Sequence, residues 1–212
     1  MGSSGPASGH KDGVEVEVKL RLPDAEAHGK VLSLLSGSLG ERHEQENYFF
    51  DGTEGELEQT LSVLRVRFYD VDKKATVTLK GKAVMEDGVG RAKEMEASLD
   101  PAKGREALKN PDVLLGLDCP VMAFVRKKFG EGVKLRCLGG FDNFRQEAHW
   151  EGQVLEVDET KFEWGTLYEI EAETAEPEAL KGRLEAWLQG ADVPYAYSTT
   201  TKFANFRNRT LE

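Results

Sequence analysis

The stretch VEVEVKLRL, residues 14–22, alternates strictly between aliphatic and charged side chains. Successive side chains of a β-strand point to opposite faces, so the pattern predicts a strand with one aliphatic and one charged face. The charged face carries two carboxylates and two cations, from Glu15, Glu17, Lys19 and Arg21. This stretch alone leaves two interpretations open: the charged face is exposed to solvent, or it lines a site.

The same alternation recurs along most of the chain and predicts eight or nine strands joined by short links. Short links favour an antiparallel sheet or barrel over a parallel one. From the alternation and the turn residues between the segments, further strands are predicted at 47–50, 61–70, 74–82, 91–99, 133–138, 143–150, 153–162 and 166–174.

Helical spacing and capping residues interrupt this pattern at 24–37, 100–110 and 176–190, whereas 118–130 could be either a helix or a strand. The fold class is therefore α+β. The predicted helices are available to cover the aliphatic side of a curved sheet. We expect a Gly/Ser-rich flexible leader or cloning remnant at 1–12, a single domain at 13–206 and a short tail at 207–212.

Composition excludes several classes of protein. The formal net charge of −10 argues against a general nucleic-acid binder, which needs an excess of Lys and Arg. No apolar run approaches the roughly 20 residues that a membrane span requires. Two cysteines, Cys119 and Cys137, are too few for a disulfide framework, which favours a reducing, cytoplasmic location.

The charges on the predicted strands are sorted by sign. Arg and Lys gather on 61–70 and 74–82, whereas carboxylates gather on 91–99, 153–162 and 166–174. A solvent-exposed face is the simpler interpretation for one strand, but exposed faces usually mix polar residue types. If helices cover the aliphatic faces from outside, the charged faces of a barrel point inward. Arg and Lys suit phosphate oxygens, and carboxylates suit hard divalent cations, so this interior predicts a metal–polyphosphate site.

The order of these residues resembles the CYTH superfamily, the triphosphate tunnel metalloenzymes. Glu15-x-Glu17-x-Lys19 is similar to the ExExK signature of that family. It is followed by Arg65-x-Arg67, Lys80, Glu94-x-Glu96, LEVDET, Glu169-x-Glu171 and Lys202, so the resemblance covers roughly residues 14–205. The segment from Gly139 to Thr174 looks like the plant branch, whose members are similar to inorganic triphosphatases.

The resemblance implies a closed eight-stranded antiparallel β-barrel, a tunnel with a charged interior and outer helices. It implies catalytic roles for Glu15, Glu17, Lys19 and Lys80. The implied triphosphate contacts are Lys19, Arg65, Arg67, Lys80, Arg145 and Lys202, with Lys128 carried over only weakly. Mg²⁺ or Mn²⁺, two ions per site, would be bound by Glu15, Glu17, Glu94, Glu96, Asp158, Glu169 and Glu171.

The expected reaction is metal-dependent hydrolysis of tripolyphosphate to pyrophosphate and phosphate, by positioning and electrostatics without a covalent intermediate. The expected partner is a small anionic substrate, and the chain is expected to be a monomer or weak dimer. Thiamine triphosphatase, nucleoside triphosphatase and adenylyl cyclase remain alternatives within the superfamily. A polyphosphate-binding module without catalysis is disfavoured by the acidic pairs, and a lipocalin-like carrier would require the valines of 14–22 to point inward.

Overall fold

In the computed structural model of the chain, residues 10–212 are described, with side chains described from Asp12 onward. The expected leader at 1–12 therefore lies mostly outside the described residues. The first strand, β1 (His10–Leu22), contains the stretch 14–22 and begins three residues before the expected start of the domain. None of the described helices is long and apolar enough to span a membrane.

The described strands form an α+β structure with one antiparallel sheet. Their hydrogen-bonded order is β10-β1-β9-β8-β7-β2-β3-β4-β6-β5, and β1 also pairs with β6. This additional pairing closes the ladder over the eight strands from β1 to β6, with β5 and β10 outside it. The predicted closed eight-stranded antiparallel barrel is thus confirmed.

The chain divides into two compact units, each described here by itself. The first unit comprises residues 10–13, 48–82 and 93–139 of the described chain, and the second comprises 14–47, 83–92 and 140–212. Four long strands contribute residues to both units: β1, β2 (Leu39–Gly52), β6 (Val89–Leu99) and β7 (Leu135–Trp150).

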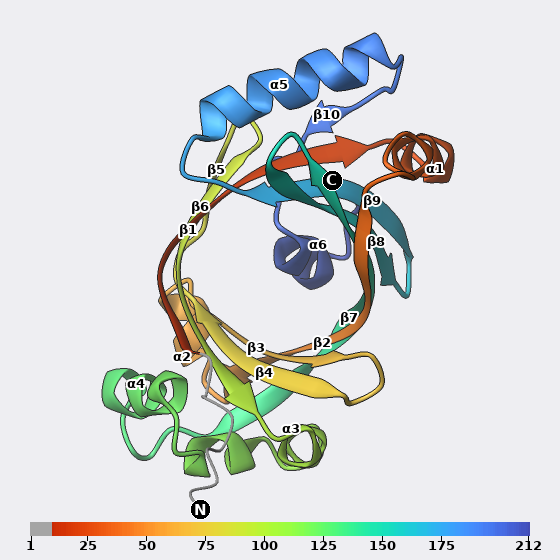
Figure 1. Ribbon diagram of the computed structural model, residues 1–212. Coiled ribbons are helices and arrows are strands. Elements are labelled where there is room, and N and C mark those ends of the chain that lie inside the picture. The colour runs from red at the N-terminus through yellow and green to blue at the C-terminus, as the bar shows by residue number, and fades with distance from the viewer. Residues whose placement is uncertain (1–9) are drawn as a thin grey trace, which may run out of the picture. The chain divides into compact units, whose positions relative to one another are not determined.

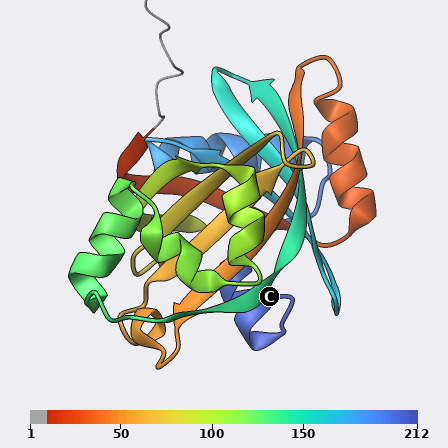
Figure 2. The same cartoon turned by 90° about the horizontal axis from the view of Figure 1, so that it is seen from below.

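The first unit contains β3 (Val63–Tyr69) and β4 (Lys74–Lys80), whose aliphatic faces are covered by helices (Figure 2). Alternate residues of β3 are buried, and Leu64, Val66 and Phe68 form its core face. They join one hydrophobic cluster with residues of three helical segments. These are α3 (Pro101–Ala107), η1 (Pro111–Gly116) and α4 (Pro120–Phe129); α2 (Glu56–Gln59) precedes β3. Residues 118–130, left open by the sequence, are therefore mainly helical.

The second unit contains β8 (Gln153–Phe162), β9 (Gly165–Glu173) and most of β1. Helices α1 (Ala25–Leu34) and α5 (Pro177–Gly190) cover the aliphatic face of these strands (Figure 1). Val18, Leu20 and Leu22 are at most 1% exposed within this second core. Val18, Leu20 and Leu22 therefore pack under helices, whereas Val14, at the start of the stretch, is 69% exposed; the charged residues of the stretch occupy the other face of the sheet.

Helix α6 (Lys202–Asn208) lies on the other side of β8 and β9 from α1 and α5 (Figure 1). Its first residue, Lys202, contacts carboxylates of those two strands. A short strand, β10 (Ala196–Tyr197), pairs with β1 shortly before α6 begins. The second unit thus places helices on both faces of its strands.

Several element boundaries differ from those predicted. β2 begins at Leu39 instead of 47, because its first half is polar and lacks alternation, and 133–138 and 143–150 form the single strand β7 through Gly139 and Gly140. The two-residue strand β10 and β5 (Val84–Glu86) are too short to show a period. A tight hairpin joins β7 to β8, in which Trp150 pairs with Gln153 and the φ values are left-handed, 46° at Glu151 and 78° at Gly152.

Candidate active site

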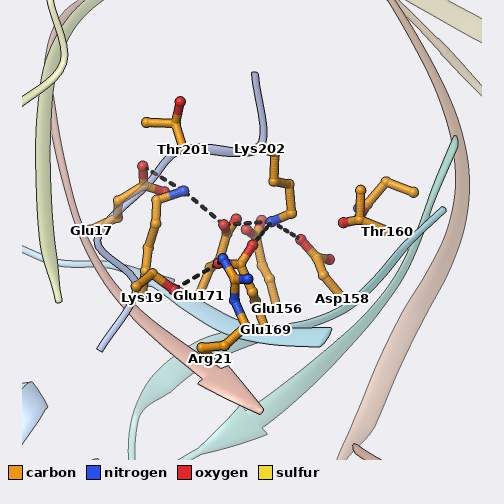
Figure 3. A network of polar contacts seen from close by, with 12 residues as sticks. Glu17, Lys19, Arg21, Glu156, Asp158, Thr160, Glu169, Glu171, Thr201 and Lys202 are labelled. Atoms are coloured by element: carbon orange, nitrogen blue, oxygen red, sulfur yellow. Dashed lines mark hydrogen bonds and ion pairs between the residues drawn. The ribbon is translucent and has the colours of Figure 1, made fainter. Parts of the chain in front are cut away.

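A cluster of interleaved carboxylates and cations covers the charged face of the second unit (Figure 3). β1 and β9 pair in the register Lys19↔Glu171, and the Lys19 ammonium lies 2.7 Å from Oε1 of Glu171 and 3.0 Å from Oε1 of Glu17. Both Lys19 and Glu171 are buried. The solvent-exposed interpretation of the opening stretch is thus wrong at Lys19, whose ammonium is shielded and paired.

Lys202 reaches the same carboxylates from α6. Its Nζ lies 2.8 Å from Oδ2 of Asp158, 3.0 Å from Oε2 of Glu169 and 2.5 Å from Oε1 of Glu171. Lys19 and Lys202 therefore share the Oε1 atom of Glu171. In Figure 3 the two ammonium groups point toward Glu171 from opposite sides.

Arg145 of β7 connects the two acidic strands. Its guanidinium donates to Asp158 through Nε at 2.8 Å and Nη2 at 2.6 Å, a bidentate pair, and through Nη2 to Glu171 at 2.9 Å. Its Nη1 pairs with Glu156. Such forked contacts fix the planes of both partners as well as neutralising them, so Arg145 orients the carboxylates of β8 and β9 together.

Burial and pairing shift the ionisation of this cluster. Burial would raise the pKa of Asp158, but Arg145 and Lys202 outweigh it and lower the pKa to about 2. Burial likewise opposes the charged form of Glu171, yet Lys19, Lys202 and Arg145 hold its pKa well below the ordinary value. Burial alone would lower the pKa of Lys19, but Glu17 and Glu171 raise it well above its usual range. All three side chains are therefore charged at neutral pH.

The carboxylate oxygens of this face have the donor chemistry that Mg²⁺ and Mn²⁺ take in proteins. Within residues 10–212, no three His, Cys, Asp or Glu side chains are arranged as a ready metal-binding group. Instead, Asp158, Glu169 and Glu171 converge on a cation, the Lys202 ammonium. The donor set therefore fits a divalent cation by its chemistry, and in this structure its three carboxylates converge on the ammonium of Lys202.

The first unit carries a second charged face, in ordered rows across β3, β4 and β6. The register aligns Arg65 with Thr78 and Glu96, and Lys80 with Glu94. Lys80 Nζ lies 2.7 Å from Oε2 of Glu94, and Arg65 donates to the Thr78 hydroxyl at 3.3 Å. The Thr78 hydroxyl in turn donates to Glu96 at 2.9 Å.

The row that contains Arg67 differs from the other two because its partners across β4 and β6 are hydroxyls. Arg67 aligns with Thr76, and Thr76 with Ser98. The Thr76 side chain is 2% exposed, and its Oγ1 finds no hydrogen-bond partner among the described residues. Arg67 also lies 5.8 Å from the ring centroid of Tyr69. Burial would raise the pKa of the Tyr69 phenol, but the neighbouring Arg67 lowers it.

The structure brings most of the predicted site residues into these two groups. Lys19, Glu17, Asp158, Glu169, Glu171, Arg145 and Lys202 share the cluster of the second unit. Arg65, Arg67, Lys80, Glu94 and Glu96 share the face of the first unit. Glu15 lies two residues before Glu17 on the same face of β1 and is half-buried.

Lys128 is placed differently from the other predicted cations of the first unit. It lies near the end of α4 and donates to the hydroxyl of Ser62 at 3.0 Å. Ser62 alternates in phase with the core-facing residues Leu64 and Val66, so it belongs to the opposite face from Arg65. Lys128 is thus not in the row of Arg65, Arg67 and Lys80.

Three residues of the second cluster were not among the predicted site residues. Arg21 pairs with Glu169 at 3.1 Å, Glu156 pairs with Arg145, and the Ser198 hydroxyl donates to Glu169 at 2.7 Å. The alternation of side chains along a strand could have indicated Arg21 and Glu156, because they lie in phase with Lys19 and Asp158. Nothing in the local sequence indicates Ser198, which follows β10 outside any periodic segment.

Comparison with known proteins matches residues 13–202 to the CYTH domain. A solved structure from Hippeastrum is 41% identical, with a TM-score of 0.90, over 93% of this chain and 97% of that one. That protein, HpAC1, is described as a candidate adenylyl cyclase with a dominant triphosphatase activity. No curated protein matches the chain.

More distant structures share the fold. A candidate adenylate cyclase from Bacillus halodurans is 23% identical, with a TM-score of 0.70, over 92% of this chain and 98% of that one. The PH1819 protein from Pyrococcus horikoshii is 17% identical, with a TM-score of 0.60, over 91% and 99%. At these identities the likeness extends to the fold alone.

Proposed function

The chain belongs to the CYTH domain family, and on that premise we propose that it is a divalent-metal-dependent triphosphatase that hydrolyses tripolyphosphate to pyrophosphate and phosphate. The activity described for HpAC1, at 41% identity over nearly the whole chain, supports a triphosphatase. The observation that carries the proposal is the buried cluster of the second unit, in which acidic and basic side chains interleave at hydrogen-bond distance.

The charge of that cluster argues for a metal. Its five carboxylates and four cations leave a net charge of about one negative unit when all are ionised. They are Glu17, Glu156, Asp158, Glu169 and Glu171 against Lys19, Arg21, Arg145 and Lys202. A bare polyphosphate would be repelled by such a face, whereas a polyphosphate accompanied by divalent cations brings far less net negative charge. Substrate binding is therefore expected to depend on the metal.

The residues have distinct roles in this proposal. Glu17, Glu169 and Glu171 would hold Mg²⁺ or Mn²⁺, with Asp158 and Glu15 beside them, and Glu94 and Glu96 are further predicted contacts. When bound, such ions neutralise phosphate oxygens and lower the pKa of a coordinated water. Lys19, Arg145 and Lys202 stabilise negative charge on the phosphate oxygens, with Arg145 held in a fixed plane by Asp158. Arg65, Arg67 and Lys80 are the predicted phosphate contacts of the first unit.

We favour inorganic tripolyphosphate over an organic triphosphate as the substrate, because the aromatic rings on this face of the second unit pack against one another. Phe141 and Trp164 lie 6.0 Å and 6.3 Å from the ring of Phe206 on α6. Phe162 stacks on Trp164 at 5.0 Å. A base-binding enzyme would need such rings for its ligand.

Two free cysteines are consistent with a cytoplasmic, reducing location for the enzyme.

A phosphate-release panel tests the proposal. The full chain would be assayed with tripolyphosphate, ATP, thiamine triphosphate, pyrophosphate and long-chain polyphosphate, each with Mg²⁺, Mn²⁺ or a chelator. We expect release from tripolyphosphate that the chelator abolishes. Faster turnover of an organic triphosphate, or cyclic AMP formed from ATP, would replace the proposed substrate. Absence of metal-dependent release from every compound would point to a binding module instead.

A further inference from the structure

Lys202 occupies the point on which three carboxylates of the second unit converge. Asp158, Glu169 and Glu171 all lie within 3.0 Å of its ammonium, and its side chain is 13% exposed. These are the oxygens that a divalent cation would take under the proposed function. Two cations cannot share one such position, because like charges at hydrogen-bond distance repel strongly inside a protein.

The helix that carries Lys202 is fixed by contacts that do not involve the ammonium. At its start, the Thr201 hydroxyl accepts from the amide of Ala204 at 3.1 Å. Farther along, the ring of Phe206 lies among Phe141, Phe203 and Trp164 at centroid distances of 6.0 to 6.4 Å. The body of α6 is therefore held by packing against β7 and against the turn between β8 and β9, the two strands that carry the carboxylates.

The chain after α6 folds back and locks the helix. Asn205 is fully buried, and its amide group donates to the carbonyl of Glu212 at 2.9 Å and accepts from the amide of Glu212 at 2.8 Å. The Thr210 hydroxyl also donates to Asn205 at 2.8 Å, and the Trp164 indole donates to the Thr210 carbonyl at 3.0 Å. Asn205 and Trp164 thus fix α6 so that only the flexible stem of Lys202 is left to move.

We propose that Lys202 is a tethered counter-cation that a divalent metal must displace, and that Asn205 and Trp164 are positioning residues that keep its ammonium among the carboxylates. The proposal rests on the proposed metal dependence of the site. It assigns Lys202 two positions: on Asp158, Glu169 and Glu171 before the metal binds, and away from them, free to meet a phosphate oxygen, afterwards. The anchored helix raises the local concentration of the ammonium, so it lowers the apparent affinity for metal.

The test is Mn²⁺ binding to the full chain without substrate, by titration calorimetry. We expect Lys202→Met to bind Mn²⁺ about tenfold more tightly or better, because the competing charge is gone. Lys202→Arg should remain within about threefold of the original chain, because it restores the charge. Asn205→Ala should bind more tightly than the original chain by a smaller factor, because it loosens the tether. A merely structural role for Asn205 would not strengthen metal binding.

Arg207→Met is the matched control, because it removes the same charge from an exposed position of the same helix. Its Mn²⁺ affinity should stay within about twofold of the original, since exposed charges are well screened. A Lys202→Met protein that binds Mn²⁺ equally or more weakly would overturn the proposal, as would a chain that binds no metal in any variant.

A second measurement avoids mutation of the site and covers the case in which Lys202→Met does not fold. Amine acetylation of the unmodified chain, mapped by mass spectrometry, should be slow at Lys202 and become at least about threefold faster when Mn²⁺ saturates the protein, because displacement removes its ion pairs. Unchanged protection of Lys202 with Mn²⁺ bound would contradict displacement. Because no substrate is present in either experiment, tighter binding by Lys202→Met combined with no phosphate release would refute the proposed function and leave the displacement intact.

Discussion

Lys19 and Glu171 are direct cross-strand partners on β1 and β9, and their charged atoms lie 2.7 Å apart with both side chains buried. Glu17 on the same strand completes the contact to Lys19 at 3.0 Å. A buried charge depends on its partner for the solvation that it lost on folding. This pair therefore ties the stability of the second unit to the same groups that the proposed chemistry needs.

Removing one member of this pair should destabilise the protein. We expect Lys19→Met to lower the free energy of unfolding by about 1–3 kcal/mol, because Glu17 and Glu171 lose one counter-charge while Glu171 keeps Lys202 and Arg145. Urea denaturation would measure the change. The double variant Lys19→Met/Glu171→Gln should lose less free energy of unfolding than the sum of the two single variants. The reason is that Glu171→Gln removes the negative charge whose partner Lys19→Met has removed. Strict additivity would show that the two side chains do not interact.

The low pKa of Asp158 predicts how stability falls in acid. Its folded-state pKa of about 2 lies below the ordinary 3.8, so its contribution is complete above the ordinary value and disappears as the pH falls through about 2. The difference corresponds to about 2 kcal/mol. Asp158→Asn should therefore be less stable at neutral pH and should lose less stability between pH 5 and pH 2, as judged by urea midpoints. If the stability of Asp158→Asn fell as steeply between pH 5 and pH 2 as that of the original chain, Asp158 would not be the group responsible for the loss.

The alternation of aliphatic and polar residues was sufficient to predict most of the long strands and which face of each is buried. The alternation at 61–70 and 153–162 identified β3 and β8, because one face of each is packed under helices and had to be aliphatic. It could not predict the first half of β2, where LGERHEQE is polar on both faces and mostly exposed or half-buried. Pairing with neighbouring strands, not a local hydrophobic pattern, makes that segment extended.

The candidate site was predictable as a set of residue types but not as a set of partners. Strand parity placed Lys19, Asp158 and Glu171 on charged faces. It could not show that Lys202, which follows β9 by some thirty residues, shares Glu171 with Lys19, because that contact depends on how α6 returns to the sheet. Ser198 was missed for the same reason, since its contact to Glu169 comes from tertiary placement alone.

Substitution of Glu17 tests catalysis with less effect on folding than substitution of Glu171. It is half-buried at the edge of the cluster, and Lys19 keeps its contact to Glu171 when Glu17 is neutralised. We expect Glu17→Gln to reduce metal-dependent phosphate release by at least about a hundredfold, a loss typical of a group that acts on the transition state. Its thermal unfolding should change little. The exposed Glu178→Gln on α5 is the matched control and should retain full activity; wild-type turnover by Glu17→Gln would exclude Glu17 from the mechanism.

Two helical glycines should respond to alanine with opposite signs. A Cβ at Gly104 of α3 would lie 2.8 Å from the ring of Phe68, which Arg105 also covers with its guanidinium 3.8 Å from the centroid. Gly104→Ala should cost about 1–3 kcal/mol through overpacking. Gly182 of α5 has open space around its Cβ position, so Gly182→Ala should stabilise by about 0.5–1 kcal/mol. Calorimetric melting of both variants would decide, and a stabilised Gly104→Ala would refute the close packing of α3 on Phe68.

Thr76 and Thr78 point to the same face of β4 but differ in what their hydroxyls contact. Thr78 accepts from Arg65 and donates to Glu96, whereas Thr76 Oγ1 is buried with no hydrogen-bond partner among the described residues. Burying an unsatisfied hydroxyl costs about 1–3 kcal/mol, so Thr76→Val, which keeps the shape, should raise the free energy of unfolding. Thr78→Val should lower it, because Arg65 and Glu96 lose their shared contact.

Activity measurements would show why such a hydroxyl is present. Under the proposed function, phosphate oxygens near Arg67 would accept a hydrogen bond from Thr76, its neighbour in the register of β3 and β4. Thr76→Val should therefore raise the KM for tripolyphosphate about fivefold or more while the protein becomes more stable, since one neutral hydrogen bond contributes about 1 kcal/mol. A purely structural hydroxyl would leave KM unchanged. A Thr76→Val protein that is less stable than the original would instead mean that the hydroxyl already has a partner within the fold.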